Sequence, residues 1–135
     1  MCGIALAIGY VDERIEGAVG LMSDAQAHRG PDDQGLVRSA NAVLAHRRLS
    51  IIDLSANGHQ PMKDPESGLV IVYNGEVYNH RELREELAQG GVRFRSQTDT
   101  EVVLKAYARW GEACVDRLRG MYAFAVWDSR EQRLF

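Results

Sequence analysis

A cysteine at the second position can become an N-terminal nucleophile. Cys2 follows the initiator Met1, and small second residues such as cysteine permit removal of that methionine. Removal would leave a thiol and a free α-amine on adjacent carbons. An α-amine titrates near pH ~7.7–8.0 and a free thiol near ~8.5, so the amine can serve the thiol as a base close to neutrality. Alone the dipeptide is a weak signal, because many proteins carry a second-position cysteine that does no chemistry.

Five residues farther along are suited to an amino-acid substrate with a side-chain amide. A thiolate that attacks an amide needs donors where the oxyanion forms, and the Asn74 side chain and the Gly75 backbone can supply them. Arg48 offers a two-pronged donor to an α-carboxylate. Asp99, together with Glu76, can hold an α-ammonium. Each such donor or charge pair is worth on the order of 2–4 kcal/mol to the step it serves.

Strands must position these residues. The small and apolar run Gly3–Tyr10 predicts a buried strand, which would hold Cys2 at a strand end inside the protein. Asn74-Gly75 is expected to end the strand Leu69–Tyr73, and Ala40–Ala42 is expected to form a tight hairpin loop. The other predicted strands are Gly35–Ser39, Val43–Arg47, a short one at Phe94, Met121–Trp127 and a returning strand at Arg133–Phe135.

Helical periodicity and capping residues predict the remaining elements. Apolar spacing predicts a helix over Ile15–His28 and a short helical segment over Gly111–Leu118. Asn79 and Thr98, each followed three residues later by glutamate, predict the starts of two more helices. Between the strands, Arg48–Met62 is irregular and predicts a long functional loop.

Composition narrows the class of protein. The 135 residues fit one domain, and the net charge of −3 and pI near 5.8 argue against a nucleic-acid binder. Two cysteines suit a reducing compartment. The apolar run Ile4–Ile8 is too short for a signal peptide or a membrane span. We therefore expect a cytoplasmic protein that binds neither nucleic acid nor membrane.

Several residues receive structural interpretations. We expect Arg47 to be a surface arginine, Cys114 a buried apolar residue, and the turn Arg29–Asp32 to shape the pocket floor. The histidines lack metal-ligand spacing, so no metal site is expected. Core or interface positions are assigned to Trp110, Tyr122 and Trp127.

Six motifs, in this order, resemble the class II glutamine amidotransferase domain, in the variant found at the N-terminus of glutamine-dependent asparagine synthetases. They run the whole length of the chain and are Met1–Ile4, His28–Asp32, Ala45–Ile51, Gln60–Met62, Tyr73–Asn79 and Thr98–Glu101. The resemblance implies an α+β fold of the N-terminal-nucleophile hydrolase type, an αββα sandwich of two antiparallel sheets between helices.

The resemblance also implies roles for residues. Cys2 would be the nucleophile once Met1 is removed, with its own amine as the base, and Asn74 with Gly75 would form the oxyanion hole. Arg48 would bind the glutamine carboxylate, and Asp99 would bind the ammonium. Glu76 would lie near Asp99, and backbone groups of three residues would help Arg48: Leu49, Ile51 and Ile52.

The expected function is hydrolysis of L-glutamine to glutamate and ammonia through a Cys2 thioester, active only after Met1 removal. The ammonia would go to a synthetase domain or chain that uses ATP and Mg²⁺; the glutaminase part needs no cofactor. No glycine-rich pyrophosphate loop of that synthetase kind occurs in residues 1–135, so the synthetase is expected to be absent. Because the returning strand has only begun at Phe135, the glutaminase domain is expected to be incomplete at its C-terminal end.

An alternative of another class stays open: a glutamine-binding or interaction fragment without turnover. While Met1 is attached, the Cys2 nitrogen is an amide and cannot act as a base. A cysteine hydrolase of another amide would need a pocket without the Arg48 and Asp99 pair. The identity of the ammonia acceptor and the formation of a homodimer are also left open.

Overall fold

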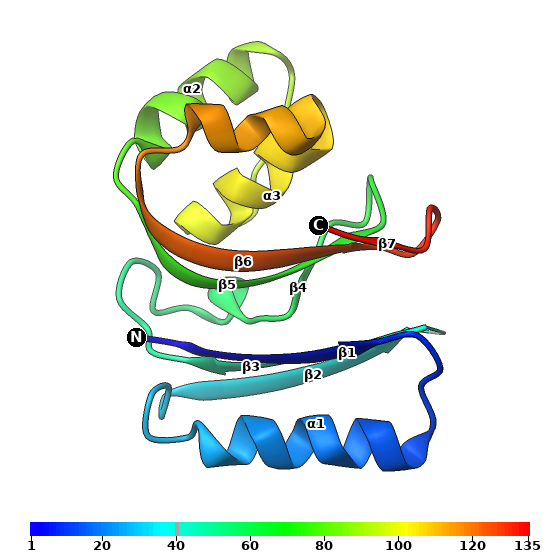
Figure 1. Cartoon of the computed structure of the whole chain (residues 1–135). Coiled ribbons are helices and arrows are strands. Elements are labelled where there is room, and N and C mark those ends of the chain that lie inside the picture. The colour runs from blue at the N-terminus through cyan, green and yellow to red at the C-terminus, as the bar shows by residue number, and fades with distance from the viewer. Residues whose placement is uncertain (40) are drawn as a thin grey trace.

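Four layers make up the structure, a computed structural model that describes residues 1–39 and 41–135 (Figure 1). Helix α1 covers a three-stranded antiparallel sheet of order β1-β3-β2, which faces a four-stranded antiparallel sheet of order β4-β5-β6-β7. Helices α2 and α3 cover the far side of that second sheet. The α+β sandwich expected from the motifs is therefore confirmed.

The elements in chain order are β1 (Gly3–Ile8), α1 (Glu13–Ala25), β2 (Asp33–Ser39), β3 (Ala42–Arg48), a 3-10 turn (Ala56–Gly58), β4 (Met62–Lys63), β5 (Leu69–Val77), α2 (His80–Gln89), α3 (Asp99–Trp110), a 3-10 segment (Gly111–Arg117), β6 (Gly120–Asp128) and β7 (Arg133–Leu134).

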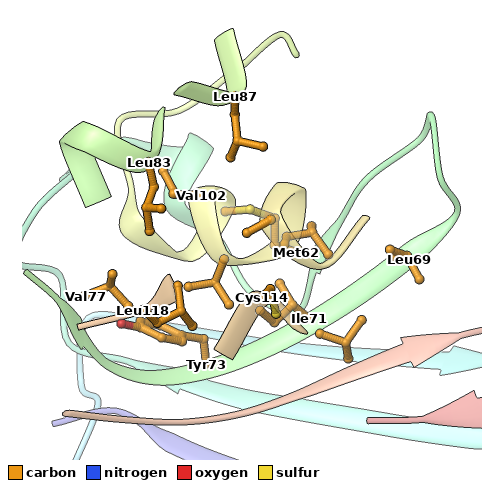
Figure 2. Close-up of a cluster of buried hydrophobic side chains, with 14 residues drawn as sticks. Met62, Leu69, Ile71, Tyr73, Val77, Leu83, Leu87, Val102, Cys114 and Leu118 are labelled. Carbon is orange, nitrogen blue, oxygen red and sulfur yellow. The ribbon is translucent and has the colours of Figure 1, made fainter. Parts of the chain in front are cut away.

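Alternation along each strand sorts its side chains between two cores. In the first sheet the even-numbered residues of β1 and β3 point toward the second sheet, and the odd-numbered ones point toward α1. In β5 the even-numbered residues Val70 and Val72 face the first sheet. Its odd-numbered residues face α2 and α3, as Figure 2 shows for Ile71, Tyr73 and Val77.

Helix starts follow local hydrogen bonds. The Asp12 side chain accepts the Ile15 N–H at 2.9 Å, and α1 ends at Ala25, three residues before the expected end. Thr98 caps α3 by accepting the Glu101 N–H at 3.1 Å, as the sequence predicts. Asn79 was predicted to cap α2 and does not.

Asn79 instead joins two loops. Its amide nitrogen donates to the Arg117 carbonyl at 2.9 Å, and its amide oxygen accepts the Arg119 N–H at 2.9 Å. The Asn79 side chain therefore makes a tertiary contact, and helix α2 begins at His80 without a side-chain capping hydrogen bond from Asn79.

The prediction that β5 ends at Asn74-Gly75 was wrong. The strand continues to Val77 because β6 pairs with it as far as Gly120. A side chain at Gly75 would overlap the Met121 carbonyl and the Tyr122 backbone of β6, so glycine permits close strand pairing here rather than a turn.

Two other local predictions differ in outcome. The segment around Phe94 is not a strand; its ring packs on the helical core, with the Arg84 guanidinium 4.2 Å from its centroid. The hairpin expected at Ala40–Ala42 has Ser39 opposite Ala42, as a tight connection requires, while Ala40 itself lies outside the described residues. Within residues 1–39 and 41–135, no helix combines the length and apolar character needed to cross a membrane.

Candidate active site

A pocket of about 360 Å³ opens at the end of the sandwich where Cys2 lies. It receives residues from both sheets, from the loop after β3 and from the start of α3. All nine residues singled out from the sequence line it: Cys2, Arg48, Leu49, Ile51, Ile52, Asn74, Gly75, Glu76 and Asp99.

Strand alternation brings the polar residues into this space. Cys2 extends the β1 row that faces the second sheet, and Arg48 ends the matching row of β3. Asn74 and Glu76 continue the β5 row that faces the first sheet. The pocket therefore forms where these rows change from apolar to polar side chains.

Arg47 and Arg48 leave β3 on opposite faces. Arg48 is buried and lines the pocket. Arg47 points toward α1, where it pairs with Asp24 and donates to the Ser23 carbonyl at 3.2 Å. The expectation that Arg47 is a surface residue was wrong, because its side chain is largely covered by the helix that it anchors.

The Cys2 sulfur is held beside the backbone of the loop that follows β3. The Leu49 N–H donates to Cys2 Sγ at 3.4 Å, and the Arg29 side chain donates to the Cys2 carbonyl at 3.1 Å. The turn Arg29–Asp32, expected to shape the pocket floor, does not line the pocket; it supports the pocket through the bond from Arg29 to the Cys2 backbone. The Leu49 N–H, expected to help bind a carboxylate, is engaged by sulfur in this state.

The Arg48 guanidinium is oriented by its own loop. It donates to the Asp53 carbonyl and, at 3.1 Å, to the Ser55 carbonyl. A guanidinium carries five N–H donors, so further donors remain for a ligand. A side chain at Gly58 would overlap this guanidinium, which explains the glycine in the loop.

The Asp99 carboxylate is buried at the N-terminus of α3 and accepts three hydrogen bonds. The donors are the Tyr73 hydroxyl at 2.7 Å, the Val77 N–H at 3.0 Å and the Thr100 N–H at 3.0 Å. Burial and the neighbouring Asp99 charge raise the pKa of Tyr73, so its hydroxyl stays protonated and donates. About four acceptor sites on a carboxylate leave room for one more donor.

His46 links the two sheets beneath the pocket. It is 1% exposed, and its Nε2 lies 2.9 Å from the Tyr73 carbonyl oxygen. Burial is the main reason that the pKa of His46 falls from 6.5 to about 4. The nearby Arg48 charge also lowers this pKa, whereas the hydrogen bond to the Tyr73 carbonyl raises it. His46 is therefore neutral near pH 7 and donates through Nε2.

Sequence reasoning missed three residues at this site: His46, Gln60 and Tyr73. Each belongs to one of the recognised motifs, but His46 was interpreted as structural because the histidines lack metal-ligand spacing, and Gln60 and Tyr73 were given no role. Strand parity is the signal that could have found His46, two residues before Arg48. Cys114, by contrast, is buried in the helical core as expected, where burial raises its pKa to about 11.

Comparison with known proteins identifies the family. The glutamine amidotransferase domain family matches residues 1–135. This chain belongs to that family. The resemblance derived from the six motifs is therefore confirmed.

Relatives of this amidotransferase domain are asparagine synthetases. It is 39% identical over 139 residues to the glutamine-hydrolysing asparagine synthetase 3 of Bacillus subtilis (strain 168), covering all of this chain and 22% of that protein. It is 46% identical over 112 residues to asparagine synthetase B of Escherichia coli (strain K12), covering 82% of this chain and 20% of that protein. The chain thus spans about a fifth of the length of these curated relatives.

Solved structures support the fold of the domain. The glutamine phosphoribosylpyrophosphate amidotransferase of Bacillus subtilis superposes with a TM-score of 0.78 at 18% identity, over 96% of this chain and 35% of that one. At this identity the likeness concerns the sandwich alone. Among the described residues, no group of three or more His, Cys, Asp or Glu is placed to hold a metal ion.

The buried neutral His46 predicts a pH-dependent stability. Its unfolded form takes up a proton near pH 6.5 and its folded form near pH 4, so the free energy of unfolding should fall as the pH drops through this window. The loss should be on the order of 3 kcal/mol. The test is to measure the free energy of unfolding in urea at several pH values for the wild type and for His46→Gln. The glutamine amide can still donate to the Tyr73 carbonyl but does not titrate, so the difference between the two profiles is the contribution of His46. Parallel pH profiles for the two proteins would exclude it.

Proposed function

We propose that this domain hydrolyses L-glutamine to glutamate and ammonia through a thioester at Cys2, once Met1 has been removed. The observation that carries the proposal is the convergence of a thiol, an arginine, an asparagine-glycine pair and a buried carboxylate on one pocket. Membership of the glutamine amidotransferase domain family supports the choice of substrate.

The proposed reaction begins with the thiol. The free α-amine of Cys2 takes the proton of Sγ, directly or through a water, and the sulfur bonds to the side-chain amide carbon of glutamine. The Asn74 amide and the Gly75 N–H donate to the oxyanion. The tetrahedral adduct collapses by breaking the carbon–nitrogen bond, and the proton held on the amine leaves with the nitrogen as ammonia. Water then attacks the thioester, releases the thiol and gives glutamate.

Recognition of glutamine rests on its two backbone charges. The unused donors of Arg48 bind the α-carboxylate, with help from backbone groups of Leu49, Ile51 and Ile52. The remaining acceptor site of Asp99, with Glu76, binds the α-ammonium. Because Arg48 and Asp99 are both buried, their charges act with little screening by water.

Met1 controls this chemistry. It precedes Cys2 in the chain and lines the mouth of the pocket. With Met1 attached, the Cys2 nitrogen belongs to a peptide bond and has no lone pair available as a base. The unprocessed protein therefore binds glutamine without turning it over, which is the alternative function of a binding module.

We further propose that residues 1–135 form the glutaminase part of a larger amidotransferase. The asparagine synthetase relatives are about five times longer than the segment they share with this chain. A synthetase domain or chain that uses ATP and Mg²⁺ would receive the ammonia in the cytoplasm. The glutaminase part would need no cofactor of its own, and a homodimer is compatible with this arrangement.

Replacement of the nucleophile tests the central step. In a preparation whose intact mass shows loss of Met1, glutamate release should be abolished in Cys2→Ala, because no other described thiol reaches the pocket. Cys114→Ala serves as the matched control and should retain turnover, since Cys114 lies in the helical core. Processed wild-type protein that binds glutamine but releases no glutamate would favour the binding module.

The two adjacent arginines provide a second test. Arg48→Ala should raise the KM for glutamine at least about 30-fold, the equivalent of ~2 kcal/mol for a buried carboxylate partner. Arg47→Ala removes the neighbouring charge but lies on the α1 face, so it should change the KM less than about threefold. Steady-state glutaminase kinetics of the two variants measure both KM values. Equal effects of the two substitutions would remove Arg48 from carboxylate binding.

A further inference from the structure

The edge of β5 that faces away from β6 loses its neighbouring strand, β4, just before the pocket. Strand β4 pairs only Met62 with Ile71 and Lys63 with Val70. Pro61 comes next and has no N–H to continue a ladder. Continuing this register would set Gln60 opposite Tyr73, so side chains rather than a strand must satisfy the rest of the β5 edge.

Two side chains replace the missing strand. The Tyr73 N–H donates to Gln60 Oε1 at 2.7 Å, and the Val77 N–H donates to Asp99 Oδ2 at 3.0 Å. By strand alternation the Gly75 N–H points to this same edge, midway between them. It has no acceptor among the described residues, and Gly75 lines the pocket. Along this edge of β5, the N–H groups of Tyr73 and Val77 are therefore bonded to side chains, and the Gly75 N–H between them is free to donate.

Gln60 is itself firmly held. It is 4% exposed, and its Nε2 lies 3.3 Å from the Thr100 hydroxyl on α3. His46 holds the carbonyl of the same Tyr73 residue at 2.9 Å. Both backbone polar groups of Tyr73 are therefore tied by buried side chains, which fixes the strand two residues before Gly75.

We propose that Gln60 is a positioning residue for the oxyanion hole, acting by capping Tyr73 N–H so that Gly75 N–H alone faces the substrate. This role rests on the proposed glutamine hydrolysis. Gln60 lines the pocket, but we assign the substrate carboxylate and ammonium to Arg48 and Asp99 and give Gln60 no contact with either group. Its loss leaves the buried Tyr73 N–H without an acceptor, and the strand must shift to find one.

Kinetics on the Met1-processed chain test the role. Gln60→Met keeps the length of the side chain but has no strong acceptor, whereas Gln60→Glu keeps an oxygen for Tyr73 N–H and can accept from the Thr100 hydroxyl. A displaced oxyanion donor should lower kcat by about 10–100-fold in Gln60→Met, with the KM within about threefold, because the ground state does not use it. Gln60→Glu should recover most of the kcat.

Three kinetic outcomes would overturn the proposal. The first is an unchanged kcat in Gln60→Met. The second is a raised KM at constant kcat in that variant, which would mean that Gln60 contacts the substrate directly. The third is an equal loss of kcat in Gln60→Met and Gln60→Glu. If Gln60→Met does not fold, Thr100→Val removes the anchor of Gln60 while keeping side-chain shape, and should lower kcat at constant KM; an unchanged kcat there contradicts the role.

A readout without turnover separates this proposal from the proposed function. The Gly75 amide resonance should shift in Gln60→Met and return toward the wild-type position in Gln60→Glu, whether or not the wild type hydrolyses glutamine. A Gly75 resonance that is the same in all three proteins refutes the positioning role. An inactive wild type with the expected shifts would instead refute only the hydrolysis.

Discussion

The pocket depends on one geometric constraint, the two-residue alternation of side chains on strands whose sheets face each other. Even-numbered residues of β1, β3 and β5 fill the space between the sheets with Ile4, Leu6, Ala42, Leu44, Val70 and Val72. At one end the same rows continue as Cys2, Arg48 and Asn74. A one-residue slip in any of these strands would turn its polar residue away from the others. The apolar packing between the sheets therefore sets the alignment of the chemical groups as well as stability.

Buried polar contacts then orient what alternation brings together. Arg48 is held by loop carbonyls and Asp99 by Tyr73, Val77 and Thr100, so both charges are in place before a ligand arrives. Such groups need no reorganisation when a ligand binds, so the proposed contacts would favour binding of the substrate, whose backbone charges do not change during the reaction. The short length of β4 also matters, because a longer β4 would pair with β5 at Gly75 and would accept the Gly75 N–H, which would then be unable to donate to a ligand.

Much of this could be predicted from the sequence, because motif order and strand alternation are local properties. The sandwich followed from the family resemblance of the six motifs, the Thr98 cap from its capping-box spacing, and the buried Cys114 from its place in a predicted helical segment. Arg47 was misjudged although parity alone assigns it to the α1 face. The end of β5 was misplaced because Asn74-Gly75 is a common turn dipeptide, and only the close approach of β6 shows why glycine stands there. The roles of Asn79 and Gln60 depend on contacts with residues about 40 positions away, which no local pattern encodes.

The proposed mechanism requires that the γ-glutamyl group of glutamine becomes covalently attached to the sulfur of Cys2. Rapid acid quenching of the Met1-processed chain after mixing with glutamine, followed by peptide mass spectrometry, tests it most directly. The expected result is one γ-glutamyl group on the peptide that contains Cys2 and none on the peptide that contains Cys114. Glutamate formation with no acyl group on Cys2 at any quench time, or with the group on Cys114, would contradict it.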